Sequence, residues 1–86
     1  MLNIYYKPQF IRQIKKLSPA AQDEVIEKIE LLKHEKNHAA LKIHKLHGKL
    51  KGTLSFSVNY KDRIVFEYVS KDEISLLVIG NHDVYN

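Results

Sequence analysis

The sequence predicts a single α+β domain in which two N-terminal helices pack on one face of a twisted, mainly antiparallel sheet. Three observations lead to this prediction. The 86 residues suffice for one core and exclude a second. Apolar residues recur at helical spacing in two early segments and alternate in later ones. The predicted order over residues 1–86 is β-α-α-β-β-β.

The first third of the chain is predicted to form one strand followed by two helices. Alternation predicts a short strand over residues 2–6. Pro8 suits the first turn of a helix, where its missing N–H costs nothing, and helical spacing continues to residue 17. Ser18 before Pro19 is a second start signal and predicts a helix over residues 19–34. The apolar stripe of this helix consists of Ala21, Val25, Ile29 and Leu32, widened by Ile26.

The rest of the chain supplies three further strands. Residues 35–51 show no clean period and are predicted to be mainly loop, with a helical turn at residues 39–42. Alternation predicts a half-buried strand over residues 54–60 and another over residues 64–68. The nearly all-apolar residues 74–79 predict the central strand, covered on both faces. On the face away from the helices we expect Ser55, Ser57, Asn59, Arg63 and Val65.

Charge is distributed unevenly along this basic chain, whose net charge is +4. No carboxylate lies between Glu35 and Asp62. A one-sided cationic stretch attracts a polyanion such as nucleic acid, although a merely lysine-rich solvated surface has the same composition. The stretch contains Lys36, His38, Lys42, His44, Lys45, His47, Lys49, Lys51 and Lys61.

Several classes of protein are disfavoured by the composition. The chain has no cysteine, which rules out disulfides and thiolate metal sites. It has no apolar run of the ~18 residues that a membrane span needs, and Met1–Lys7 is not a signal peptide, so we expect a cytoplasmic protein without a membrane partner. The histidines lack the spacing of a metal site, so we expect no metal, and there is no serine nucleophile motif or phosphate-binding glycine loop.

The residues present are suited to metal-free cleavage of RNA. The attacking 2′-oxygen must lose a proton, the leaving 5′-oxygen must gain one, and the phosphorane between them gains negative charge. Imidazole can take either proton role near neutral pH, while arginine and lysine hold phosphate. The groups available for these roles are His44, His47, Lys49, Lys51, Arg63, His82 and Tyr85.

Three segments resemble the RelE/ParE superfamily of bacterial type II toxins, in its RelE/YafQ-like branch. They are LHGKLKGTLSFSVNY, DRIVFEY and the closing IGNHDVY, and the order of elements agrees over essentially the whole chain. The resemblance implies a RelE-like fold and a ribosome-dependent mRNA endoribonuclease that inhibits translation. It also implies a cognate antitoxin, contact with the ribosome and mRNA, and no cofactor.

The resemblance also implies roles for individual residues. Arg63 matches the arginine that contacts the scissile phosphate, and His82 matches a C-terminal catalytic histidine. Tyr85 falls near a terminal catalytic tyrosine, and Asp83 falls where some members have a catalytic acid. Each residue also has a structural alternative: a surface arginine opposite a carboxylate, a histidine that caps a strand end, a tyrosine that packs the chain end, and an aspartate that orients His82 or ends the strand. Our hypothesis makes Arg63 the phosphorane clamp and His82 the general acid.

The general base is expected from the loop before the second predicted strand. His47 resembles the family's loop histidine, but a different gap places His44 there, and the sequence leaves both open. Lys45, Lys49 and Lys51 are the expected RNA phosphate contacts. The chain departs from RelE itself, because the positions of two RelE lysines fall near Leu54 and Phe56, so a lysine base is not available.

Two other functions remain open at the level of sequence. A ParE-like toxin would have the same order of elements but would poison DNA gyrase without any nuclease activity. An inactive RNA-binding module would use its lysines only to hold phosphate, and its binding would fall uniformly with salt. The His82 and Tyr85 pair favours the nuclease.

Overall fold

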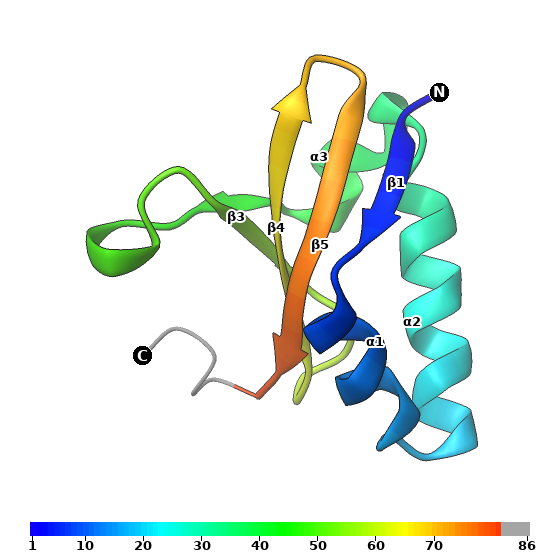
Figure 1. The fold of residues 1–86 in the computed structure, drawn as a ribbon. Coiled ribbons are helices and arrows are strands. Elements are labelled where there is room, and N and C mark those ends of the chain that lie inside the picture. Colours follow the sequence, from blue (N-terminus) through cyan, green and yellow to red (C-terminus); the bar gives the residue numbers. More distant parts are fainter. Residues whose placement is uncertain (82–86) are drawn as a thin grey trace.

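A five-stranded sheet forms the centre of the computed structural model, which describes residues 1–81 (Figure 1). The strands lie in the order β1-β5-β4-β3-β2. β1 pairs in parallel with β5, and the other three pairs of neighbours are antiparallel, so the sheet is mainly antiparallel as predicted. The strands are β1 (Asn3–Tyr6), β2 (His44–Lys45), β3 (Leu54–Ser57), β4 (Arg63–Ser70) and β5 (Glu73–Gly80).

The two predicted helices are present at their expected places. Pro8 begins α1 and Pro19 begins α2, and the Ser18 hydroxyl accepts a hydrogen bond from the Ala21 N–H at 3.2 Å, which caps the second helix. A third, single-turn helix falls close to the predicted turn at residues 39–42. The helices are α1 (Pro8–Lys15), α2 (Pro19–Leu32) and α3 (His38–Leu41), with 3₁₀ turns at Glu35–Asn37 and Gly48–Leu50.

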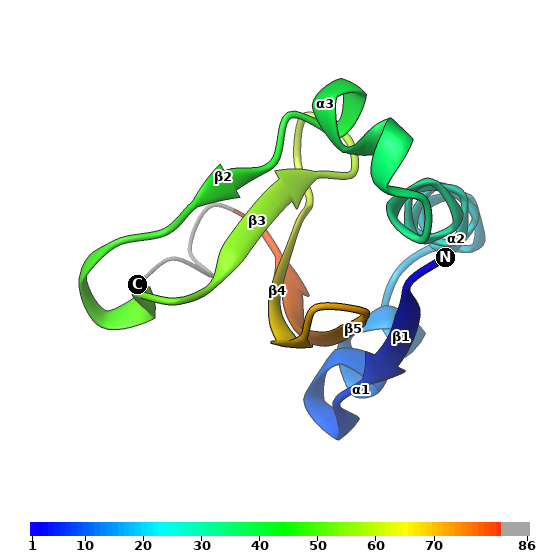
Figure 2. The same cartoon turned by 90° about the horizontal axis from the view of Figure 1, so that it is seen from above.

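The core lies between the sheet and the helices. Figure 2 shows the sheet curving around α2, so that one face of the sheet is turned toward this helix. Phe56 and Phe66 meet edge to face there, with ring centroids 5.9 Å apart, a favourable geometry for aromatic pairs. The fully buried members of the core are Phe10, Val25, Leu32, Phe56, Ile64, Phe66, Ile74 and Leu76.

Beyond the end of β1, the start of α1 and a side chain of this helix form hydrogen bonds with β5. The Lys7 N–H donates to the Leu76 carbonyl oxygen at 3.0 Å. Further along β5, the Ile79 N–H donates to the Gln13 side-chain oxygen of α1 at 2.8 Å. Beyond the residues that pair with β1, this edge of β5 is therefore contacted by the start of α1 and by the Gln13 side chain.

The segment before β3 differs from the predicted loop. It contains β2, which gives the sheet a strand that the sequence did not predict. Two residues are too few to show an alternating pattern, so the hydropathy of this strand gave no signal. Lys42, with φ of 55°, ends α3 in the left-handed region and redirects the chain into β2.

Three further expectations about the strands and α2 were wrong. β3 ends at Ser57 instead of residue 60, because residues 58–62 form a turn in which Tyr60 is 95% exposed. Ile26 is exposed and does not widen the buried stripe of α2. The strand predicted to be central, β5, is interior but lies second from the edge, and β4 is the middle strand. The unpredicted strand β2 at the opposite edge makes β4 the middle strand of five.

Within residues 1–81, no helix has the length and apolar character needed to span a bilayer.

Candidate active site

The sheet face turned away from the core carries both His44 and Arg63. In β2, His44 pairs with Ser55, which pairs in turn with Val65 of β4. Paired residues of neighbouring strands direct their side chains to the same face, as do residues two apart along one strand. Arg63 precedes Val65 by two residues and pairs with Ser57, so it shares the face of His44. We call this the outer face.

The intervening residues confirm this assignment. Phe56 and Ile64 alternate with the residues of the outer face and belong to the core that packs against the helices. The outer face is therefore opposite the core, as the alternation in the sequence predicted. That prediction was right for Ser55, Ser57, Arg63 and Val65 and does not apply to Asn59, which lies in the turn after β3.

Ideal strand geometry gives the approximate separation of His44 and Arg63 on the outer face. Two strand spacings of about 4.8 Å and one two-residue step of about 6.7 Å separate their α-carbons, which gives roughly 12 Å. A histidine and an arginine directed to the same side from such positions can approach one phosphate from two directions. His44 is exposed and Arg63 is half-buried.

The middle of the outer face is closed to solvent. Ser55 and Val65 lie between His44 and Arg63, and each is 1% exposed. The register of these two residues was predicted correctly, but their exposure was not. The polar groups of the outer face thus border a buried centre instead of an open sheet surface.

A second group of predicted site residues surrounds a hollow in the β2–β3 hairpin. The Leu46 N–H donates to the Thr53 carbonyl oxygen at 3.0 Å and closes the hairpin, while Gly52, with φ of +92°, makes its turn. Lys45 pairs with Leu54 and so faces away from His44. The hollow, of about 340 Å³, is lined by Lys45, Leu46, His47, Lys51, Gly52, Thr53 and Leu54.

The structure therefore separates the loop residues into two sets. His44 shares the outer face with Arg63, whereas Lys45, His47 and Lys51 border the hairpin hollow. Lys49 lies in the exposed 3₁₀ turn at the tip of the hairpin. The sequence had not separated these two sets: it left His44 and His47 open as the base and indicated the lysines as RNA phosphate contacts.

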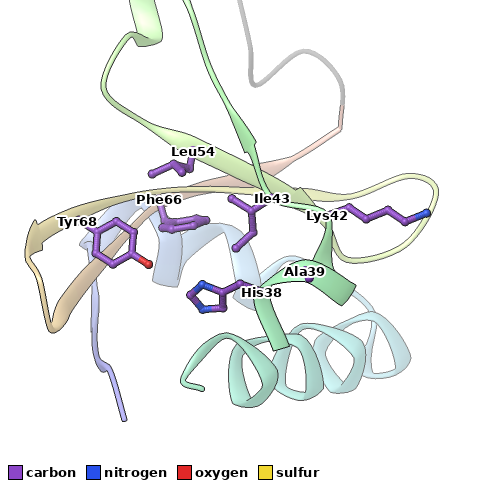
Figure 3. Close-up of a pocket in the computed structure, with 7 residues that line it drawn as sticks. All are labelled: His38, Ala39, Lys42, Ile43, Leu54, Phe66 and Tyr68. Atoms are coloured by element: carbon purple, nitrogen blue, oxygen red, sulfur yellow. The ribbon is translucent and has the colours of Figure 1, made fainter. Parts of the chain in front are cut away.

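Another hollow, of about 380 Å³, lies between α3 and the sheet (Figure 3). Phe66, Ile43 and Leu54 form its apolar wall, and the His38 ring and the Tyr68 hydroxyl face each other across it, while the Lys42 side chain extends away. Leu54 also borders the hairpin hollow, so the two hollows adjoin.

The polar groups of this hollow are partly engaged by the fold. The His38 Nε2 atom lies 2.8 Å from the Leu32 carbonyl oxygen, which can only accept, so Nε2 carries the hydrogen. Burial, followed by the charge of Glu35, raises the pKa of Tyr68. Neither His38 nor Tyr68 was predicted as a site residue, and the only signal in the sequence was the place of His38 in the cationic stretch.

The turn before β4 holds Arg63 at the beginning of its strand. The Val58 N–H donates to the Asp62 carbonyl oxygen at 2.9 Å, and the Asn59 side-chain oxygen accepts from the Asp62 N–H at 2.7 Å. Asp62 is only 7% exposed, and its carboxylate accepts from the Asn59 amide at 3.3 Å. Sequence reasoning missed this buried acid, and an asparagine three residues before an aspartate was the available signal.

The three predicted C-terminal site residues, His82, Asp83 and Tyr85, lie outside the described residues. In the chain, His82 follows Gly80 by two residues, and Gly80 pairs with Arg63. Among residues 1–81, no group of three histidine, aspartate or glutamate side chains has an arrangement suited to a metal ion.

Solved structures with the same fold include several bacterial toxins. YafQ from Escherichia coli superposes with a TM-score of 0.75 at 18% identity, over 98% of this chain and 97% of YafQ. The YoeB–YefM toxin–antitoxin heterotetramer from Staphylococcus aureus gives 0.72 at 23% identity, over 95% and 98%. This chain has a RelE-like fold.

A third similar structure comes from Mycobacterium tuberculosis. The RelBE2 toxin–antitoxin complex superposes with a TM-score of 0.71 at 17% identity, over 94% of this chain and 98% of the chain compared. No family model matches the sequence, and no curated protein is similar to it in sequence. The fold that the resemblance implied is thus confirmed, over almost the full length of each chain compared.

Proposed function

We propose that this protein is the toxin of a type II toxin–antitoxin pair and that it cleaves mRNA on the ribosome without a metal ion, thereby inhibiting translation. The observation that carries the proposal is the placement of His44 and Arg63 on one face of a sheet with the RelE-like fold. The cationic stretch between Glu35 and Asp62 supports RNA as the partner. The YoeB–YefM and RelBE2 complexes support an antitoxin as a second partner.

In the proposed mechanism His44 acts as the general base. Its imidazole takes the proton of the 2′-hydroxyl, and the 2′-oxygen attacks the adjacent phosphorus. Arg63 donates hydrogen bonds to the phosphorane oxygens as negative charge develops on them. The bond from phosphorus to the 5′-oxygen then breaks, leaving a 2′,3′-cyclic phosphate on one fragment.

Protonation of the leaving 5′-oxygen completes the reaction. We assign this step to His82, with Tyr85 and Asp83 as its neighbours in the chain. The Lys45, His47 and Lys51 group around the hairpin hollow, together with Lys49, is assigned to RNA phosphates away from the cleaved bond. The ribosome would position the mRNA, because holding reactants in place lowers a barrier by several kcal/mol.

Reconstituted translation with a defined, end-labelled mRNA tests the proposal. Adding the purified protein, released from its antitoxin, should stop translation and produce cuts in mRNA that is being translated. Supercoiling by purified gyrase should be unaffected in a parallel reaction. Intact mRNA together with inhibited gyrase would contradict the proposal and support a ParE-like toxin.

A further inference from the structure

The turn of residues 58–62 presents an aromatic side chain almost entirely to solvent. Tyr60 is 95% exposed, whereas the other exposed tyrosines among residues 1–81, Tyr5, Tyr6 and Tyr68, are between 42% and 49% exposed. The ring of Tyr60 contributes nothing to the core. Folding therefore gives no reason for an aromatic residue at this position.

The turn itself is held firmly. The Asn59 side-chain oxygen accepts from the Lys61 N–H at 2.8 Å and from the Asp62 N–H at 2.7 Å, and the Val58 N–H donates to the Asp62 carbonyl oxygen at 2.9 Å. The Asn59 amide also donates to a Glu24 carboxylate oxygen of α2 at 3.2 Å. These bonds fix the backbone on both sides of Tyr60, so little backbone entropy remains to be lost when a ligand binds.

The position of the turn connects it to the candidate active site. Arg63 follows Tyr60 by three positions, so their α-carbons lie at most about 11 Å apart. Lys61, also exposed, stands between them in the chain. Proteins that bind single-stranded nucleic acids combine aromatic rings, on which bases stack, with cations that contact the phosphates. Tyr60, Lys61 and Arg63 offer this combination.

The nearby acids do not oppose such a contact strongly. The carboxylates of Glu24 and Asp62 both accept hydrogen bonds from the Asn59 amide, at 3.2 and 3.3 Å. Stacking uses the face of the ring and depends little on net charge, so it tolerates these neighbours.

We propose that Tyr60 stacks on an unpaired RNA base and that Lys61 contacts a phosphate next to that base. Together the two contacts position the RNA for cleavage at the outer face. The proposal rests on the proposed function and names how its substrate is held. Tyr60 is a positioning residue in this scheme, because it touches the RNA away from the bond that breaks.

A binding experiment tests the contact directly. The chain contains no tryptophan, so the Tyr60→Trp variant has a single tryptophan reporter at the proposed site. A 2′-O-methyl oligoadenylate cannot be cleaved and serves as the probe. We expect its titration to quench the fluorescence of Tyr60→Trp to saturation and to leave that of Tyr5→Trp, a control on β1, unchanged. No quenching, or equal quenching of the two variants, would overturn the proposal.

A kinetic experiment separates this proposal from the proposed function. In the reconstituted cleavage reaction, Tyr60→Ala should raise KM about tenfold with little change in kcat, because stacking of one base supplies that much affinity. Tyr60→Phe keeps the ring and should behave like the wild type. Efficient cleavage with an unchanged KM for Tyr60→Ala would overturn the stacking proposal while leaving the nuclease intact. Absence of cleavage by the wild type would overturn the nuclease, and the fluorescence titration would still decide the base contact.

Discussion

His44 and His47 are three residues apart, yet the fold gives them different surroundings. His44 shares a sheet face with Arg63, while His47 borders the hairpin hollow beside Lys45. The sequence alone left both histidines open as the general base. We propose His44 because the register of β2, a two-residue strand that leaves no pattern in the sequence, places it on the face of Arg63.

We expect His44→Ala to reduce the rate of mRNA cleavage by about 10²–10⁴-fold, the usual contribution of a general base. His47→Ala is the matched control, and we expect it to change the rate much less, since the ring lies away from Arg63. The measurement is the single-turnover rate of cleavage in reconstituted translation. A larger loss in His47→Ala than in His44→Ala would contradict the assignment of the base.

At the scale of elements, the sequence predicted those with strong periodicity or clear start signals. The Ser18 cap and Pro19 located the start of α2, and alternation located β4. The end of β3 was missed because Val58 continues the alternation and is itself buried, although the backbone has already entered the turn. Hydropathy reports burial, and burial does not require strand pairing.

Tyr5 of β1 and Ser70 both form hydrogen bonds with Glu73 at the β4–β5 turn, and we call these three residues the polar clamp. The Tyr5 hydroxyl donates to a Glu73 carboxylate oxygen at 2.7 Å, and the Ser70 hydroxyl donates to the other at 2.8 Å. The bond to Tyr5, and then that to Ser70, lowers the pKa of Glu73 below its ordinary value of 4.5. The same bond to Glu73 raises the pKa of Tyr5 above 10.0.

These shifts predict a pH-dependent contribution to the stability of the parallel β1–β5 pair. A lowered carboxylate pKa stabilises the fold above the ordinary pKa, and this contribution disappears as the pH falls through the folded value. Tyr5→Phe should therefore lower the melting temperature slightly at pH 7 and have a smaller effect as the pH falls below about 4. Thermal melting of both proteins between pH 2.5 and 7 measures the difference. A difference that is constant over this range would show that the clamp contributes no charged interaction.

At the scale of the whole molecule, acidic and basic residues lie in different segments of the chain. Acidic residues gather on α2, whereas the segment from α3 through the β2–β3 hairpin has cations only. Among the described residues, the ion pair found is Lys33 with Glu30 at 2.8 Å, which involves none of the hairpin cations. The hairpin cations are thus available for a polyanion.

A triple variant in which glutamine replaces Lys45, Lys49 and Lys51 should have a lower affinity for RNA. Its affinity should also depend less on salt concentration. Each phosphate contact to a single strand contributes about 0.7 to the slope of log affinity against log salt, so the slope should fall by about 2. The measurement is binding of the 2′-O-methyl oligoadenylate over a range of salt concentrations. Replacing Lys15, Lys16 and Lys28 in the same way is the control, and an equal fall in slope there would contradict a hairpin-specific contact.

The most direct test of the central claim is to map mRNA 5′ ends in cells after brief induction of the protein. The account predicts new ends at a fixed position within codons of translated messages, carrying the 5′-hydroxyl that attack by the 2′-oxygen leaves. Arg63→Ala should remove these ends, since we propose that Arg63 stabilises the phosphorane. Growth arrest with no new mRNA ends, or ends that persist in Arg63→Ala at wild-type levels, would contradict it.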